Sequence, residues 1–282
     1  MTDRPAGGRE SRALRLGPWP FVTLHVFIRR GRRLVWRARD HRKGLSPADR
    51  GVAAQRQPPW RRRWFNWLIG FLFAAGSTLF ALGAALSLFP AGAAPASPLA
   101  INLTFFAGSV PFTIAGYLQH FQSANAGAFP GEARGRRVAL IGWRPRQAGW
   151  LSTLAQFAGT VAFNFNTGDA IRPPAGWLAL DVAVWAPGFA GSILFLVAGY
   201  LAFIETCHAW WRWAPRDESW RLAAVNLAGC VFFLMSSIIA FGPGEPAPAP
   251  LVWQSNVWLL LGSLCFLAGG GLLMREARRA PA

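Results

Sequence analysis

An acidic residue and a histidine three positions apart form the pair in this sequence with the clearest chemical potential. Glu205 and His208 lie at the end of an apolar run, and residues i and i+3 share a face on a continuing helix. A carboxylate beside an imidazole can act as an acid/base pair or supply two metal ligands. His120, at a similar depth in another run, could supply a third group or could be an interfacial histidine with its polar tip in water. We favour a solvated helix end, because two ligands without a third do not define a metal site.

Polar residues recur at the matching place of three apolar runs. Counted from a glycine that begins a repeated pattern described below, positions +14 and +17 are polar each time: Gln122 and Asn125, Glu205 and His208, Glu276 and Arg279.

The other residue types provide no enzyme signature. The sequence has no GxSxG, no P-loop lysine pattern and no GxGxxG after a strand. Its three cysteines, Cys207, Cys230 and Cys265, lack CxxC spacing, so neither a zinc site nor a disulfide framework is predicted. We therefore predict no metal, no cofactor and no catalytic residue. The argument against an enzyme rests mainly on the absence of these motifs.

Composition explains where these residues must lie. The chain is 53% hydrophobic with 15 Trp, yet its formal net charge is +17. These values conflict in a soluble globule but agree in a polytopic membrane protein whose charge lies outside the bilayer. Six apolar runs are each long enough to cross it as a helix. They are Asn66–Phe89, Leu99–Phe121, 147–167 (the most polar), Val182–Ile204, Leu222–Gly242 and Leu251–Met274.

Three of the runs share one template of glycine, phenylalanine and glycine at offsets 0, +4 and +8. Its copies are Gly108, Phe112 and Gly116; Gly191, Phe195 and Gly199; and Gly262, Phe266 and Gly270. On a helix these offsets fall within one arc of about 100°. Small residues let two helices approach closely in lipid, so we predict a helix-packing seam. The other runs carry an amide followed by a glycine, which predicts three helical hairpins: 66–121, 147–204 and 222–274.

Arginines alternate with neutral connections along the chain. The segments 123–146, 205–221 and 275–282 are basic, whereas 90–98, 168–181 and 243–250 carry few charges or none. By the positive-inside rule both termini are cytoplasmic. The predicted fold is an all-α membrane protein of six transmembrane helices, built as three repeated hairpins.

The amino-terminal segment is the most basic part. Residues 1–63 contain 17 Lys and Arg, and no apolar core of a signal peptide. Within it, Trp19 to Arg39 reads as a helix lying on an anionic membrane surface. So much arginine could also bind nucleic acid, but no recognised motif supports that. We predict a partly disordered or membrane-surface segment over 1–63, a membrane domain over 64–276 and a short basic tail over 277–282.

The glycine-serine-phenylalanine pattern in paired helices resembles the YrhK-like family of small bacterial membrane proteins. The matching stretches are Asn66–Leu82, Gly108–Leu118, Pro187–Leu201 and Leu222–Phe241. They cover the helices and leave out the basic segment and the loops. The resemblance implies a bacterial inner-membrane protein and carries over no catalytic residues.

Two function classes follow from these features. The first is a structural or regulatory membrane module that packs through its glycine seams. Its predicted partners are the lipid bilayer, anionic headgroups, and a second copy or another membrane protein. The second is a small-solute transporter or channel with a pathway between the hairpins, lined by mid-span amides and serines. A continuous polar cavity joining the amide-bearing helices would favour the second.

Overall fold

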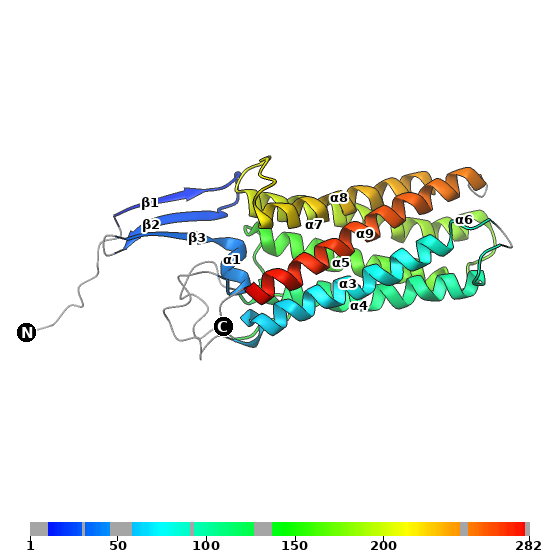
Figure 1. Ribbon diagram of the computed structural model, residues 1–282, viewed down its shortest axis with the longest axis horizontal. Coiled ribbons are helices and arrows are strands. Elements are labelled where there is room, and N and C mark those ends of the chain that lie inside the picture. Colours follow the sequence, from blue (N-terminus) through cyan, green and yellow to red (C-terminus); the bar gives the residue numbers. More distant parts are fainter. Residues whose placement is uncertain are drawn as a thin grey trace, which may run out of the picture.

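The structure is a computed structural model that describes residues 11–29, 32–45, 58–90, 93–126, 137–242 and 248–279. Figure 1 shows a bundle of long helices with a small sheet at one end. The long helices are α3 (Arg63–Leu86), α4 (Pro98–Ala124), α5 (Ala148–Asp169), α7 (Ala186–Cys207), α8 (Glu218–Ile239) and α9 (Ala249–Arg279). The short elements of the bundle are η2 (Pro59–Arg61), α6 (Trp177–Leu180) and the π-helical turn η3 (Asp181–Trp185), which runs into α7.

Five helical segments are long and apolar enough to cross a membrane. They are Arg63–Leu86, Pro98–Ala124, Trp177–Cys207, Glu218–Ile239 and Ala249–Arg279. This confirms a mostly helical chain with long apolar helices and indicates a multi-pass membrane protein. Helix α5 has 22 residues but is too polar to be counted with them. The sixth span therefore stays a prediction.

A three-stranded antiparallel sheet precedes the bundle, so the all-α prediction is wrong for this segment. The strands are β1 (Ser11–Leu16), β2 (Leu24–Arg29) and β3 (Arg32–Arg37), in the order β1-β2-β3. The predicted surface helix over 19–39 is instead mostly this hairpin, with Val26 opposite Val35. The physical reason is residue type, since each strand contains three consecutive apolar residues, at 26–28 and at 34–36, and β-branched and aromatic residues favour a pleated surface.

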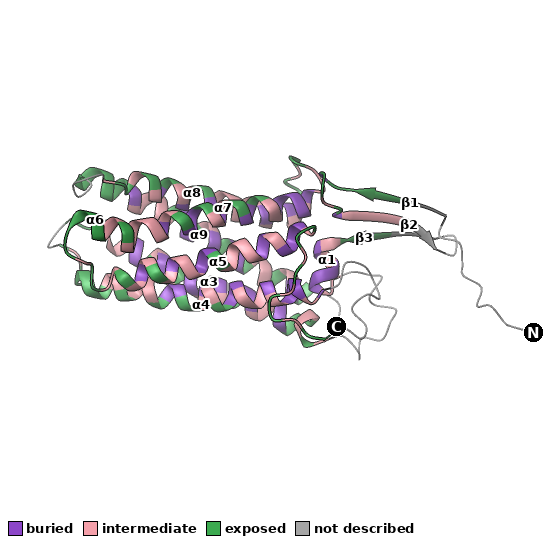
Figure 2. Ribbon diagram, turned by 180° about the vertical axis from the view of Figure 1, so that it is seen from behind, coloured by how far each residue is buried: buried purple, intermediate pink, exposed green. Residues whose placement is uncertain are grey.

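The long helices form a closed ring. Each packs against its neighbours in the chain, and α9 returns to pack against α3, giving the order α3, α4, α5, α7, α8, α9. Figure 2 shows buried residues on the inward faces of the helices and exposed residues toward the end opposite the sheet. The core of the molecule thus runs along the inside of the ring.

Facing glycines bring together the two helices of each pair α3–α4, α5–α7 and α8–α9. A Cβ atom on Gly108 of α4 would lie 3.0 Å from the carbonyl oxygen of Gly76 in α3. The same contact would be 3.1 Å from Gly191 to Gly159 oxygen, between α7 and α5. Between α9 and α8 it would be 3.1 Å from Gly262 to Gly229 oxygen. Each pair uses small residues to let two backbones approach closely.

The second glycine of each template faces a different helix. A Cβ on Gly116 would meet Thr160 of α5 at 3.4 Å, and one on Gly199 would meet Cys230 Sγ of α8 at 2.8 Å. A Cβ on Gly270 would lie 2.8 Å from the backbone nitrogen of Ala74 in α3. A helix in a closed ring has two neighbours, and the two glycines of the template contact one neighbour each. The sequence had predicted a single contact face for both glycines.

Two layers of phenylalanine rings fill the middle of the ring. Phe112, Phe195 and Phe266 form one layer, with ring centroids 5.7 to 6.1 Å apart. Phe80, Phe163 and Phe233 form the next, with centroids 5.7 to 6.5 Å apart. Every ring is at least 92% buried. The layers close the interior about halfway along the helices, because aromatic rings packed at these distances leave no room for a solute.

Candidate functional site

A short helix covers the end of the ring nearest the sheet. Helix α1 (Ala38–Lys43) follows β3 directly and ends at Gly44, whose φ of 70° is left-handed. A Cβ at Gly44 would lie 2.4 Å from the carbonyl oxygen of Arg61, so this turn requires glycine. Charged side chains are rarely buried in folded proteins unless they are paired. Of α1's six residues, four are charged or polar and buried: Arg39, His41, Arg42 and Lys43.

Two carboxylates from the ring receive the α1 cations. Arg42 Nη2 lies 2.6 Å from Glu205 Oε2 at the end of α7. Arg39 forms a bidentate pair with Glu276 of α9, at 2.6 and 3.0 Å, and Lys43 Nζ adds a third bond at 2.7 Å. Bidentate, charge-assisted bonds of this kind fix orientation as well as adding energy.

The third equivalent position also reaches α1, through an amide. Gln122 of α4 donates 2.9 Å to Asn66 Oδ1, and Asn66 Nδ2 donates 2.9 Å to the backbone oxygen of Lys43. Gln122 also donates 2.6 Å to the backbone oxygen of Trp60. Thus all three residues at position +14 of the template converge on the segment that closes the ring.

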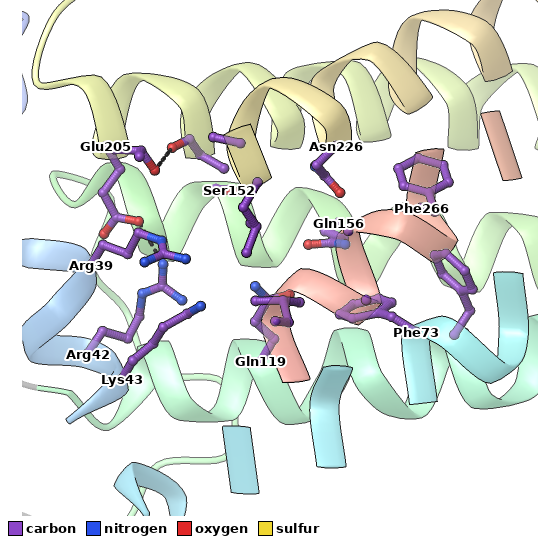
Figure 3. Close-up of a pocket in the computed structure, with 18 residues that line it drawn as sticks. Arg39, Arg42, Lys43, Phe73, Gln119, Ser152, Gln156, Glu205, Asn226 and Phe266 are labelled. Atoms are coloured by element: carbon purple, nitrogen blue, oxygen red, sulfur yellow. Dashed lines mark hydrogen bonds and ion pairs between the residues drawn. The ribbon is translucent and has the colours of Figure 1, made fainter. Parts of the chain in front are cut away.

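A cavity of ≈ 60 Å³ lies between α1 and the phenylalanine layers. Figure 3 shows Arg39, Arg42 and Lys43 entering the cavity from α1, with amide side chains farther from α1 along the helices. The amides are Gln119 of α4, Gln156 of α5 and Asn226 of α8. Phe73, Phe112 and Phe266 also line it. The cavity is therefore polar on the side of α1 and closed by phenylalanine side chains on the side of the middle of the bundle.

Burial and neighbouring charges set the electrostatics of this end. Burial lowers the pKa of Lys43 to about 8, helped by the charge of Arg39 and opposed by Glu276. For Arg39 burial acts downward too, but the Glu276 carboxylate holds its pKa above the usual range. Arg42 keeps two nitrogen atoms, Nε and Nη1, that are buried without a hydrogen-bond partner among the described residues.

The prediction that Glu205 belongs to a solvated helix end is wrong. Glu205 is 3% exposed and is paired with Arg42, because α1 folds back over the helix ends and excludes water from them. Its predicted companion points elsewhere, since His208 Nδ1 lies 3.0 Å from Thr23 Oγ1 beside the sheet. Burial lowers the pKa of His208, assisted by the charge of Arg37. The two residues do not share a hydrogen bond.

His120 does not join them either. It is buried between α4 and α5, with Nδ1 3.2 Å from Thr153 Oγ1 and its ring stacked on Phe157. It is thus neither an interfacial histidine in water nor a third ligand beside Glu205. Within the described ranges no group of three or more His, Cys, Asp and Glu residues could hold a metal ion.

Sequence reasoning missed the partners that matter here. Arg39, Arg42 and Lys43 were predicted only as basic residues of a surface segment, although Arg42 and Lys43 follow Arg39 by three and four residues, a spacing that puts them on one side of a helical turn. The other three long helices carry a related signal. The first echoes the template with Gly76 and Phe80, and the same spacing of four residues recurs, unnoticed in the sequence, at Gly159 and Phe163 and at Gly229 and Phe233.

Comparison with known proteins adds no relative. No family model, no curated protein and no solved structure matches the chain. The resemblance to the YrhK-like family stays a prediction.

Proposed function

We propose that this protein is a membrane module that holds its own basic amino-terminal segment in place at one end of a closed helical ring. The observation that carries this proposal is the set of ion pairs joining α1 to Glu205 and Glu276. Buried ion pairs contribute little net stability compared with apolar packing, but a missing partner is costly. Such pairs are suited to fixing one docked arrangement rather than to adding stability.

The positions of these carboxylates support a module built by duplication. Gln122, Glu205 and Glu276 each stand fourteen residues after the template glycine, and each lies in the second helix of a hairpin. The facing glycines and the two phenylalanine layers repeat with the same hairpin order. In this proposal three copies of one two-helix unit build the ring, and two copies have acquired a carboxylate that receives the cations of α1.

Tryptophans and arginines at the same end of the ring support the proposal of a membrane interface there. Exposed tryptophans there include Trp143 and Trp213, which pack edge to face on Trp150 and Trp220. Amphipathic rings of this kind collect at headgroup level, and arginines around them attract anionic lipid. We propose that this end faces the cytoplasm of a bacterium and contacts anionic headgroups. The outer surface of the ring is then open to lipid, a second copy or another membrane protein.

The docking proposal is tested by cutting the chain between α1 and the ring. A protease site is placed within residues 46–57, and the purified protein, tagged at its carboxyl end, is cleaved in detergent. We expect fragment 1–45 to stay bound to the ring in the parent and to be released from Glu205→Gln/Glu276→Gln. Each buried cation left without its carboxylate costs about 3–5 kcal/mol.

The matched control is Glu218→Gln. Glu218 pairs with Arg275 and Arg279 at the half-exposed surface of the same end, so its loss should cost no more than about 1 kcal/mol and leave the fragment bound. Release of the fragment from the parent, or retention by the double variant with its helical circular dichroism intact, would contradict the proposal.

A small-solute transporter or channel remains the second candidate. The observation that favours it is the cavity shared by Gln119, Gln156 and Asn226. Against it, the phenylalanine layers interrupt the path, so the polar cavity does not continue through the ring. A solute would cross only if both layers and α1 moved aside. Uptake of a labelled solute into proteoliposomes that rises in Phe112→Ala would move this candidate ahead of the module.

A further inference from the structure

The buried charges of the α1 ion-pair cluster do not balance among the described residues. Arg39, Arg42 and Lys43 provide three buried positive charges, whereas their partners Glu205 and Glu276 provide two negative ones. The buried cluster therefore carries one positive charge in excess. Because Arg39, Arg42 and Lys43 are each at least 94% buried, water screens this excess poorly. The site therefore favours one additional negative charge.

Arg42 has hydrogen-bond donors that the protein does not use. Its Nη2 bonds Glu205, but Nε and Nη1 are buried and find no acceptor in the part of the chain that the structure describes. A guanidinium has only donors and no acceptor, so these N–H groups require an acceptor from another molecule or residue. Leaving charged donors buried and unbonded costs more than leaving neutral ones. Figure 3 shows Arg42 reaching from α1 into the cavity.

Neutral donors lie along the wall of the same cavity. Gln119, Gln156 and Asn226 come from three different helices, and each carries an amide NH₂ group. Among the described residues, Glu205 is the only carboxylate that lines the cavity, and it is already paired with Arg42. An amide NH₂ group can donate to an anion, and among the described residues Asn226 Nδ2 has one weak acceptor already, Cys230 Sγ at 4.0 Å.

The size of the cavity limits the ligand. Its ≈ 60 Å³ is several times the roughly 10–15 Å³ that one water molecule requires, so a single small ion with a water or two fits. A divalent oxyanion would bring two charges to a site with one in excess. Apolar molecules are disfavoured, because they would leave the donors of Arg42 unbonded.

We propose that this cavity binds one small monovalent inorganic anion of about the size of chloride, held by Arg42 and the wall amides. The anion neutralises the excess charge and accepts the unused Arg42 donors. This inference goes beyond the docking of α1, because docking requires only the ion pairs.

Bromide is the probe, and the full chain in detergent is the sample. Binding is measured by isothermal titration, and in parallel by the unfolding midpoint as bromide replaces gluconate at constant ionic strength. In the parent we expect saturable binding near one ion per chain and a midpoint that rises with bromide, as linkage requires for a ligand of the folded state. Gln156→Glu adds a negative charge to the wall and should weaken bromide binding at least about tenfold.

Two further variants keep the test decisive. Gln254→Glu makes the same change at an exposed position near the opposite end of the ring, and should bind bromide like the parent. Ala202→Leu fills the cavity with a neutral side chain, so it tests the site even where Gln156→Glu does not fold. No saturable bromide binding in the parent, or unchanged binding in Ala202→Leu, would show that water alone occupies the cavity and would overturn the proposal. Retention of fragment 1–45 is unaffected by that result, so the two proposals fail separately.

Discussion

At the scale of single residues, the position of the Glu205 carboxylate depends on a glycine in the neighbouring helix. A Cβ atom on Gly149 of α5 would overlap the carboxylate of Glu205, so a side chain at this crossing would displace the carboxylate from its present position. The carboxylate then meets Arg42 at 2.6 Å. Small residues in membrane helices are usually explained by helix packing alone. Here one of them also provides the space that an ion pair occupies.

Gly191 provides the sharpest residue-scale prediction. A Cβ there would lie 3.1 Å from the Gly159 carbonyl oxygen and from the Phe163 ring, so Gly191→Ala requires a small shift of α5. We expect Gly191→Ala to be measurably less stable than the parent. Gly191→Leu should lose more, about 1–3 kcal/mol or above, because overpacking also displaces a central ring. Unfolding midpoints in detergent and abundance in the membrane measure both.

Gly271→Ala is the matched control for that series. Nothing lies within 4 Å of a Cβ at Gly271, and alanine is favoured over glycine in a helix by about 1 kcal/mol. This variant should be as stable as the parent or slightly more so. Equal stability of Gly191→Leu and the parent would mean that the α5–α7 contact is looser than the structure has it.

At the scale of elements, the sequence predicted the long helices and missed the short one. Hydrophobic length and alternating charge suffice for α3, α4, α7, α8 and α9, because lipid imposes both. Helix α1 has only six residues and no apolar face, so periodicity cannot reveal it. Its structure depends on carboxylates 163 and 237 positions away in the chain, which no local pattern contains. Half of the candidate site was therefore visible in the sequence, as the repeated +14 position, and its cations were not.

Docking of α1 gives the protein a predictable pH dependence. Lys43 is held between Arg39, Arg42 and Glu276, and its pKa is lowered to about 8 from the 10.5 of an unfolded chain. Between these two values the unfolded chain binds more protons than the folded one, so stability rises with pH. Below pH 8 both states are protonated, and the cost of the buried charge is fully present. We expect the free energy of unfolding to rise by up to about 3 kcal/mol between pH 8 and pH 10, and the unfolding midpoint to rise with it.

Lys43→Met isolates this effect from other groups that titrate in the same window. The variant keeps the Arg39–Glu276 pair and removes only the ammonium group. Midpoints of the parent and of Lys43→Met are compared at half-unit steps of pH. A difference between the two that stays constant from pH 7 to pH 10 would show that Lys43 keeps its ordinary affinity for protons when α1 is docked.

At the scale of the whole molecule, the polar helix α5 fits the ring because several of its polar side chains form hydrogen bonds with neighbouring residues. Asn164 Nδ2 donates 2.9 Å to Thr113 Oγ1, and Thr167 Oγ1 lies 3.2 Å from Ser109 Oγ, both across to α4. Asn166 Nδ2 donates 2.8 Å to the backbone oxygen of Val184. A segment in lipid can carry such side chains when neighbouring helices satisfy them. The mean hydropathy of α5 therefore underestimates how well this helix can be accommodated in a membrane as part of a closed ring.

The arrangement of the ring makes the membrane topology testable at three points. With α5 spanning, the connections at Ala94 and Ala175 lie at one end and that at Ala214 lies at the other, beside α1. Arginines surround the α1 end, whereas Arg172 is the only arginine among the described residues of the connections at the opposite end. Positive residues stay in the cytoplasm, so fusions of alkaline phosphatase should be active at Ala94 and Ala175 and inactive at Ala214. Green fluorescent protein fused at the same sites should give the reverse pattern. Activity at Ala94 but not at Ala175 would place α5 outside the bilayer, and since α5 lies between α4 and α7, the ring could then not close within the membrane.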